Sequence, residues 1–198
     1  MTLLEDTSPT FHERCTAVLE TERLVLRAPR YEDIKQVAML ANDRRVAENT
    51  LFIPHPYSAA DAQQWIAAAN TRPGEETFVI EREGDVIGAC GFDVREGAQP
   101  EIGYWIGASY WGQGYATEAV RALVDHALES GDHTALQAGA RVSNPASRRV
   151  LEKCGFQWTG VGLYRFRAIN SSAPCDRFRL ERSIWSSLKS WRLPRQVA

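Results

Sequence analysis

The chain has 198 residues, enough for one domain, and its 44% hydrophobic and 24% charged residues are typical of a globular protein. The net charge of −2 gives no reason to expect a nucleic-acid partner, and no apolar run approaches the roughly 20 residues that span a bilayer. The 4 cysteines are scattered without zinc-ligand spacing, so the sequence predicts no metal site. An acidic start without a signal peptide predicts a cytoplasmic protein.

The first half of the chain predicts helices followed by a group of neighbouring strands. Apolar residues at helical spacing predict a helix over Tyr31–Asn42. Ser58 and Asp61 have the spacing of a capping box, so a second helix should begin there. A turn at Gly84–Asp85 should join two antiparallel strands into a hairpin. The predicted strands of this half are Leu24–Arg27, Thr77–Arg82, Val86–Phe92 and Pro100–Ile106.

The second half predicts alternating helices and strands. An apolar stripe predicts a helix from Gly114 to about Glu129. Asn144–Pro145 predicts the start of another helix, because Asn caps helices well and Pro suits the first helical position. Residues 162–176 are predicted to form a long loop, and Trp185–Trp191 is a candidate terminal helix. The predicted strands are Leu136–Arg141, Phe156–Val161 and Phe178–Ile184.

Together these elements predict an α/β fold, with a central mixed β-sheet and helices on both faces. The unit from Pro100 to Arg141 reads as strand, helix, strand, which requires a parallel pair of strands. The preceding hairpin requires antiparallel pairs. We expect the domain to cover residues 21–186, between an N-terminal arm at 1–20 and a C-terminal tail at 187–198.

The segment from Glu101 to Glu118 carries the strongest indication of chemistry, because a strand runs there into a glycine-rich turn and then into a helix. The first N–H groups of a helix have no partner within the helix and carry partial positive charge. Glycines in the turn let an anion approach the backbone closely. The segment therefore predicts a phosphate site. The residues expected to form it are Gly112, Gln113, Gly114, Tyr115, Ala116 and Thr117.

Two common phosphate-binding motifs fit this turn poorly. A Walker loop needs Lys and Ser/Thr after its last glycine, where this chain has Tyr115 and Ala116. The dinucleotide fingerprint needs a third glycine, where Thr117 stands. A phosphate-loop enzyme that uses a nucleotide is therefore a weaker alternative, and an ordinary helix start after a glycine turn is another.

Three segments in this order resemble the GNAT acetyltransferases, and most closely their RimJ/RimL branch. They are E-I-G-Y-W at Glu101–Trp105, Y-W-G-Q-G-Y-A-T-E-A at Tyr110–Ala119 and N-P-A-S-R-R-V-L-E-K-C-G-F at Asn144–Phe156. T-E-R-L-V-L-R at Thr21–Arg27 is similar to the first strand of that branch. The phosphate loop of the superfamily usually opens with Gln or Arg. Here Trp111 takes that place, which leaves phosphate binding to the backbone.

The resemblance implies acetyl-CoA as the acetyl donor and assigns roles around it. The pantetheine arm would lie between two splayed strands, where the backbone of Tyr104, Trp105 and Ile106 would bind it and orient the thioester. Asn144, besides capping its helix, would contact the pantetheine. Ser147 would protonate the departing thiolate, although a helix serine that only lies near the donor is the alternative.

Glu101 is the candidate general base, because an amine at neutral pH must lose a proton before it can attack. Its alternatives are a binder of the substrate ammonium group and a surface strand residue. The implied reaction is direct attack of a primary amine, on a protein N-terminus or a small molecule, in a ternary complex with acetyl-CoA. A non-catalytic acyl-CoA-binding module is the alternative function. The sequence does not identify the acceptor, and it leaves a homodimer open.

Overall fold

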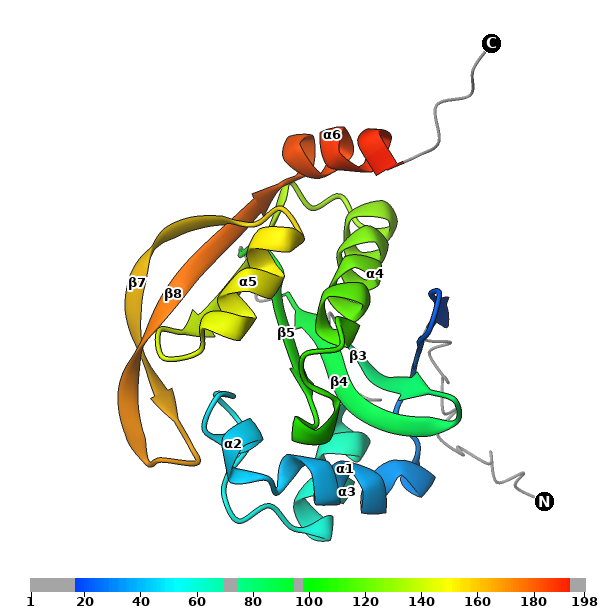
Figure 1. The fold of residues 1–198 in the computed structure, drawn as a ribbon, viewed down its shortest axis with the longest axis vertical. Coiled ribbons are helices and arrows are strands. Elements are labelled where there is room, and N and C mark those ends of the chain that lie inside the picture. The colour runs from blue at the N-terminus through cyan, green and yellow to red at the C-terminus, as the bar shows by residue number, and fades with distance from the viewer. Residues whose placement is uncertain (1–16, 70–74, 95–97, 193–198) are drawn as a thin grey trace, which may run out of the picture.

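The computed structural model describes residues 17–69, 75–94 and 98–192, which form one mixed sheet with helices on both faces (Figure 1). The strands lie in the order β1-β2-β3-β4-β5-β6-β8-β7. Strands β5 and β6 run parallel, whereas the other neighbouring pairs are antiparallel. The predicted α/β fold class is thereby confirmed. The strands are β1 (Leu19–Glu20), β2 (Val25–Arg27), β3 (Glu75–Arg82), β4 (Asp85–Asp93), β5 (Glu101–Ile106), β6 (Ala135–Arg141), β7 (Gln157–Phe166) and β8 (Ser171–Glu181).

Helices α4 and α5 cover one face of the sheet, and α1 and α3 cover the other (Figure 1). The predicted apolar stripe of α4, including Leu123 and Leu128, is fully buried against the sheet. Each such side chain contributes roughly 1.5–3 kcal/mol of burial free energy. On the other face, Val37 of α1 and Ala62 of α3 pack on Val79. The helices are α1 (Ile34–Ala41), α2 (Arg44–Ala47), α3 (Ala59–Ala69), α4 (Tyr115–Ser130), α5 (Pro145–Lys153) and α6 (Arg182–Arg192).

Both predicted helix starts have the expected caps. The Ser58 hydroxyl accepts a hydrogen bond from the Asp61 amide at 3.2 Å, and the Asp61 carboxylate accepts one from the Ser58 amide at 2.8 Å. The Asn144 side chain accepts from the Ser147 amide at 3.1 Å. Such caps typically stabilise a helix by about 1 kcal/mol. The second cap matters for function because it fixes the start of α5 beside β5.

The long loop expected at residues 162–176 is wrong, because β7 and β8 form a long hairpin through most of that range. Strand β8 ends at Glu181, so Ile184 belongs to α6 rather than to the late strand predicted at Phe178–Ile184. Strand β1 falls within the stretch expected to be an N-terminal arm, of which residues 1–16 lie outside the described part. Among the described residues, no helix combines the length and the apolar character that crossing a bilayer requires.

Candidate functional site

Strands β5 and β6 pair over a short distance and then separate. Their parallel register joins Glu101 to Gln137 and Ile102 to Ala138, and the Gln137 amide donates to the Pro100 carbonyl at 2.8 Å. Both strands continue beyond these pairs, to Ile106 and Arg141, without further pairing to each other. The result is a gap in the middle of the sheet, in the place that the family resemblance implies.

Two residues of β5 turn their backbone groups toward this gap. Backbone groups alternate in direction along a strand, and the Pro100 carbonyl points at β6. The amides and carbonyls of Tyr104 and Ile106 therefore face β6 as well, whereas those of Trp105 face β4. The Ile106 carbonyl accepts a hydrogen bond from the Trp111 indole at 2.7 Å. The Tyr104 amide and carbonyl are therefore the backbone groups of β5 best placed to form hydrogen bonds with an extended ligand in the gap.

The Tyr104 side chain reaches across the gap to α5. Its hydroxyl lies 2.8 Å from the Ser147 hydroxyl and donates to the Ser147 carbonyl at 3.1 Å. Burial raises the pKa of the Tyr104 phenol above its usual value, and the bond with Ser147 offsets this only in part. The phenol is therefore a neutral donor at physiological pH. The family resemblance implies a role only for the Tyr104 backbone, so this pair of hydroxyls was not predicted from the sequence.

The glycine-rich turn connects β5 to α4 with an unusual backbone. Gly112 and Gly114 have φ angles of 77° and 86°, in the left-handed region that favours glycine. The first bond of α4 runs from the Glu118 amide to the Gly114 carbonyl at 3.1 Å. The amides of residues 115–117 thus precede the helical hydrogen-bond ladder and are available to an anion.

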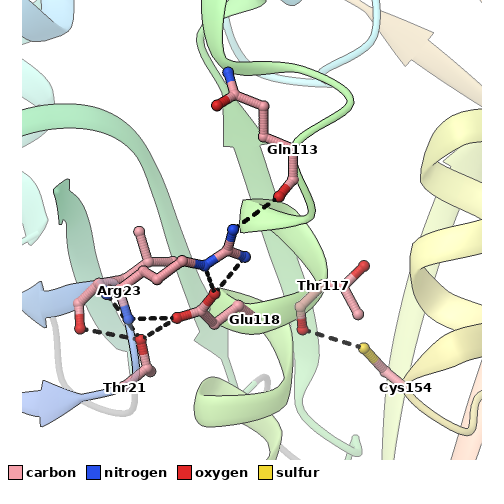
Figure 2. A network of polar contacts seen from close by, with 7 residues as sticks. Thr21, Arg23, Gln113, Thr117, Glu118 and Cys154 are labelled. Carbon is pink, nitrogen blue, oxygen red and sulfur yellow. Dashed lines mark hydrogen bonds and ion pairs between the residues drawn. The ribbon is translucent and has the colours of Figure 1, made fainter.

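The space around the turn is open where a ligand would need it. A Cβ atom added to Gly112 would meet no heavy atom within 4 Å, and one added to Gly114 would meet only Arg23, at 3.4 Å. From the other side, the thiol of Cys154, just after the end of α5, donates to the Thr117 carbonyl at 3.7 Å and holds this end of α5 against the first turn of α4 (Figure 2). The turn is therefore fixed in position while its outer face stays open.

Glu101 lies on the opposite side of the sheet from Tyr104 and Ser147. Side chains alternate along a strand, so Glu101, Gly103 and Trp105 share the face that carries α1 and α3. Trp105 packs against that cluster, which confirms the direction. Gly103 is exposed, and a Cβ atom added there would meet nothing within 4 Å. The half-buried Glu101 therefore lies beside the open space over Gly103.

Residues 48–51, at the end of α2 and just after it, contact the end of β6 and the β7–β8 hairpin. The Arg141 guanidinium donates to the Glu48 carbonyl at 2.8 Å and lies 5.4 Å from the centre of the Phe166 ring. The Arg167 amide donates to the Leu51 carbonyl at 3.2 Å. These contacts connect residues 48–51 to the β7–β8 hairpin. Within the described residues, no group of three or more His, Cys, Asp or Glu could hold a metal ion.

Residues 23–157 match the family model described as an acetyltransferase (GNAT) domain. The chain belongs to the GNAT acetyltransferases. This family consists of acetyl-CoA-dependent N-acetyltransferases, so the resemblance found in the sequence is confirmed.

Similar proteins place this GNAT enzyme near the RimJ/RimL branch. The uncharacterized N-acetyltransferase p20 of Bacillus licheniformis is 29% identical over 150 residues, which cover 72% of this chain and 84% of that protein. The ribosomal-protein-serine acetyltransferase of Escherichia coli (strain K12) is 37% identical over 81 residues, 40% of this chain and 45% of that protein. The structure of Mycobacterium smegmatis RimJ in complex with CoA-disulfide has a TM-score of 0.74 at 20% identity, over 84% of this chain and 88% of that one.

The GNAT chain offers what acetyl-CoA requires of a protein. A gap with inward-facing backbone groups suits the extended pantetheine arm, which has amide donors and acceptors. An open glycine turn at a helix start suits a diphosphate. The hydroxyls of Tyr104 and Ser147 lie on the face of the sheet that carries α4 and α5.

Proposed function

We propose that this protein transfers the acetyl group of acetyl-CoA to a primary amine, on a protein N-terminus or a small molecule, by direct attack in a ternary complex. The observation that carries the proposal is the gap between β5 and β6, because the two faces of the sheet at this gap carry different functional groups. The face with α4 and α5 carries the phosphate turn and the hydroxyl pair. The opposite face carries Glu101 and the open space over Gly103. Donor and acceptor can thus meet in the gap from opposite sides.

In this proposal the turn from Gly112 through Thr117 holds the diphosphate, and Asn144 and the backbone of Tyr104 and Ile106 hold the pantetheine, whereas the Trp105 backbone faces β4. The Tyr104 amide faces the gap and would stabilise the oxyanion that forms when the amine attacks the thioester. One such aimed donor typically contributes about 3 kcal/mol to a transition state. Holding the two reactants together supplies much of the remaining acceleration.

The hydroxyl pair supports a role for Ser147 in protonating the thiolate. The Ser147 carbonyl can only accept, so the Tyr104 proton serves either this carbonyl or the Ser147 hydroxyl oxygen. When the Tyr104 proton turns to that oxygen, the Ser147 proton becomes free to point at the thiolate. Because a thiol has a pKa of about 8.5, the thiolate leaves readily and this assistance is modest.

We propose a class of acceptors, primary amines, rather than a single compound. The ribosomal-protein-serine acetyltransferase similarity favours a protein N-terminus, and the open space over Gly103 also admits a small amine. A cytoplasmic location and a homodimer remain predictions from the sequence.

Release of free thiol from acetyl-CoA, measured with a panel of N-terminal peptides, polyamines and amino compounds, tests the proposal. We expect at least one amine to accelerate thiol release, with mass spectrometry showing the acetylated product. Tight binding of CoA without turnover of any amine would favour the non-catalytic acyl-CoA-binding module. Stabilisation of the fold by ATP but not by CoA would favour the nucleotide enzyme.

A Gly112→Ala substitution tests the phosphate turn. The added methyl would enter open space that the diphosphate should fill, so the Kd for CoA should rise about tenfold, equivalent to about 1.4 kcal/mol. Isothermal titration calorimetry gives the Kd. Gly84→Ala is the matched control, because Gly84 has a φ of 90° and equally open surroundings in the β3–β4 turn. Equal CoA affinity in both variants would contradict the assignment.

A further inference from the structure

Arg23, in the turn between β1 and β2, contacts the start of α4 at two points (Figure 2). Its Nη1 donates to the Gln113 carbonyl at 3.1 Å, and its Nε donates to the Glu118 carboxylate at 2.7 Å. The Arg23 amide donates to the same carboxylate at 2.8 Å, and the Thr21 hydroxyl donates to it at 2.7 Å. A residue some 90 positions earlier in the chain is thereby fixed to the phosphate turn.

The contact with Gln113 sets the direction of a neighbouring amide. The Gln113 carbonyl and the Gly114 N–H belong to one peptide unit, which is planar and trans, so they point in opposite directions. Glycines at 112 and 114 would otherwise let this unit rotate. By holding the Gln113 carbonyl, Arg23 turns the Gly114 N–H away from itself.

The contact with Glu118 balances a charge. Glu118 lies in the first turn of α4, with its side chain only 16% exposed, at the end of the helix that favours anions. Burial alone would raise the pKa of Glu118, but the bonds from Thr21 and Arg23 outweigh it and hold the pKa below its usual value. The carboxylate is therefore ionised beside the turn, where it would repel a diphosphate unless the Arg23 charge compensates it.

We propose that Arg23 is a positioning residue for coenzyme A, which aims the Gly114 amide at the diphosphate and cancels the charge of Glu118 there. The inference rests on the proposed location of the diphosphate at residues 112–117. Arg23 acts in it through Gln113 and Glu118. Its effect should therefore appear in the affinity for the donor and not in the chemical step.

The test compares Arg23→Ala, Arg23→Lys, Glu118→Gln and the double variant Arg23→Ala/Glu118→Gln, with the Kd for CoA measured by calorimetry. We expect Arg23→Ala to raise the Kd at least tenfold, and Arg23→Lys to raise it less because the positive charge remains. Glu118→Gln alone should bind CoA at least as tightly as the wild type. The double variant should recover at least threefold in affinity over Arg23→Ala, because the uncompensated charge is gone. A purely structural contact would show no such recovery.

Steady-state kinetics supply a second readout. In Arg23→Ala the KM for acetyl-CoA should rise with the Kd, while kcat at saturating donor stays within about twofold of the wild type. Arg179→Ala is the control, because it also removes a partly exposed arginine that is paired with a glutamate, Glu181. A comparable loss of CoA affinity in that control would show that Arg23 acts only through the net charge of the protein, and it would overturn the proposal.

The outcome separates this inference from the proposed function. If Arg23→Ala binds CoA as tightly as the wild type while Gly112→Ala does not, the role of Arg23 is wrong and the phosphate turn stands. If both variants bind CoA with the wild-type Kd, the diphosphate lies elsewhere and both proposals fail at this site. If Arg23→Ala does not fold, Arg23→Lys and Glu118→Gln still test the two contacts separately.

Discussion

Replacing Gly103 with Val is expected to lower turnover by on the order of a hundredfold or more while leaving CoA binding within about twofold of the wild type. Gly103 lies between Glu101 and Trp105 on the face that carries α1 and α3, and a Cβ atom there meets nothing within 4 Å. A valine side chain would occupy the space through which the amine must reach the thioester. A displacement of about 1 Å in the approach can cost roughly a hundredfold in rate.

The fold should tolerate this change. No positive φ holds Gly103 in a conformation that other residues avoid, and valine favours strands. The melting temperature should therefore stay the same or rise, which separates a blocked acceptor site from a damaged protein. Gly103→Ala supplies a graded comparison and should cost less turnover than valine. Full activity in Gly103→Val would show that the acceptor does not approach across this face.

The sequence predicted the parts of the fold that depend on local patterns. The apolar stripe of α4 and the caps at Ser58 and Asn144 each involve residues within one or a few turns of one another. The phosphate turn is also local, because glycines, a strand before them and a helix after them suffice to indicate it. These elements were placed within a few residues of their observed bounds.

The strands predicted at Phe156–Val161 and Phe178–Ile184 overlap β7 and β8, but the part of the hairpin at residues 162–176 was missed because its strand signal is interrupted. Gly160 and Gly162 break the alternation in β7, and Pro174 lacks the N–H that a strand inside a sheet normally donates. In the structure, β6 pairs with β8 only as far as Arg141 and Cys175. Just beyond that pair, the Pro174 carbonyl accepts from Val142. The missing N–H thus falls where the neighbouring strand has ended, which no local pattern reveals.

The candidate site was predicted only in part, because some of its contacts also depend on the folded sheet. Tyr104 and Ser147 are 43 positions apart, and Arg23 and Glu118 are 95 positions apart, so their contacts exist only once the sheet has formed. The sequence supplied the residue types but not these pairs. Glu101 and Gly103 are close in sequence, yet their shared face became informative only when α1 and α3 were placed on it.

Replacing Glu101 with Gln should lower kcat by on the order of a hundredfold at neutral pH, the usual contribution of a general base, with little change in CoA affinity. Glu101 is the first residue of β5, in the part of the strand that pairs with β6, and lies three residues before Tyr104. At about 3.3 Å per residue it is roughly 10 Å along the strand from the Tyr104 amide. Its carboxylate would therefore take the proton of the amine through water lying over Gly103.

The pH dependence distinguishes a base from a binding residue. An N-terminal amine has a pKa of about 8, so above pH 9 most of the acceptor is already neutral and needs no base. The deficit of Glu101→Gln should therefore shrink as the pH rises from 7 to about 9.5, in a pH profile of kcat. Asp93→Asn is the matched control, because Asp93 lies directly opposite Glu101 on β4. A deficit that stays constant across this range, or an equal loss in Asp93→Asn, would remove Glu101 as the base.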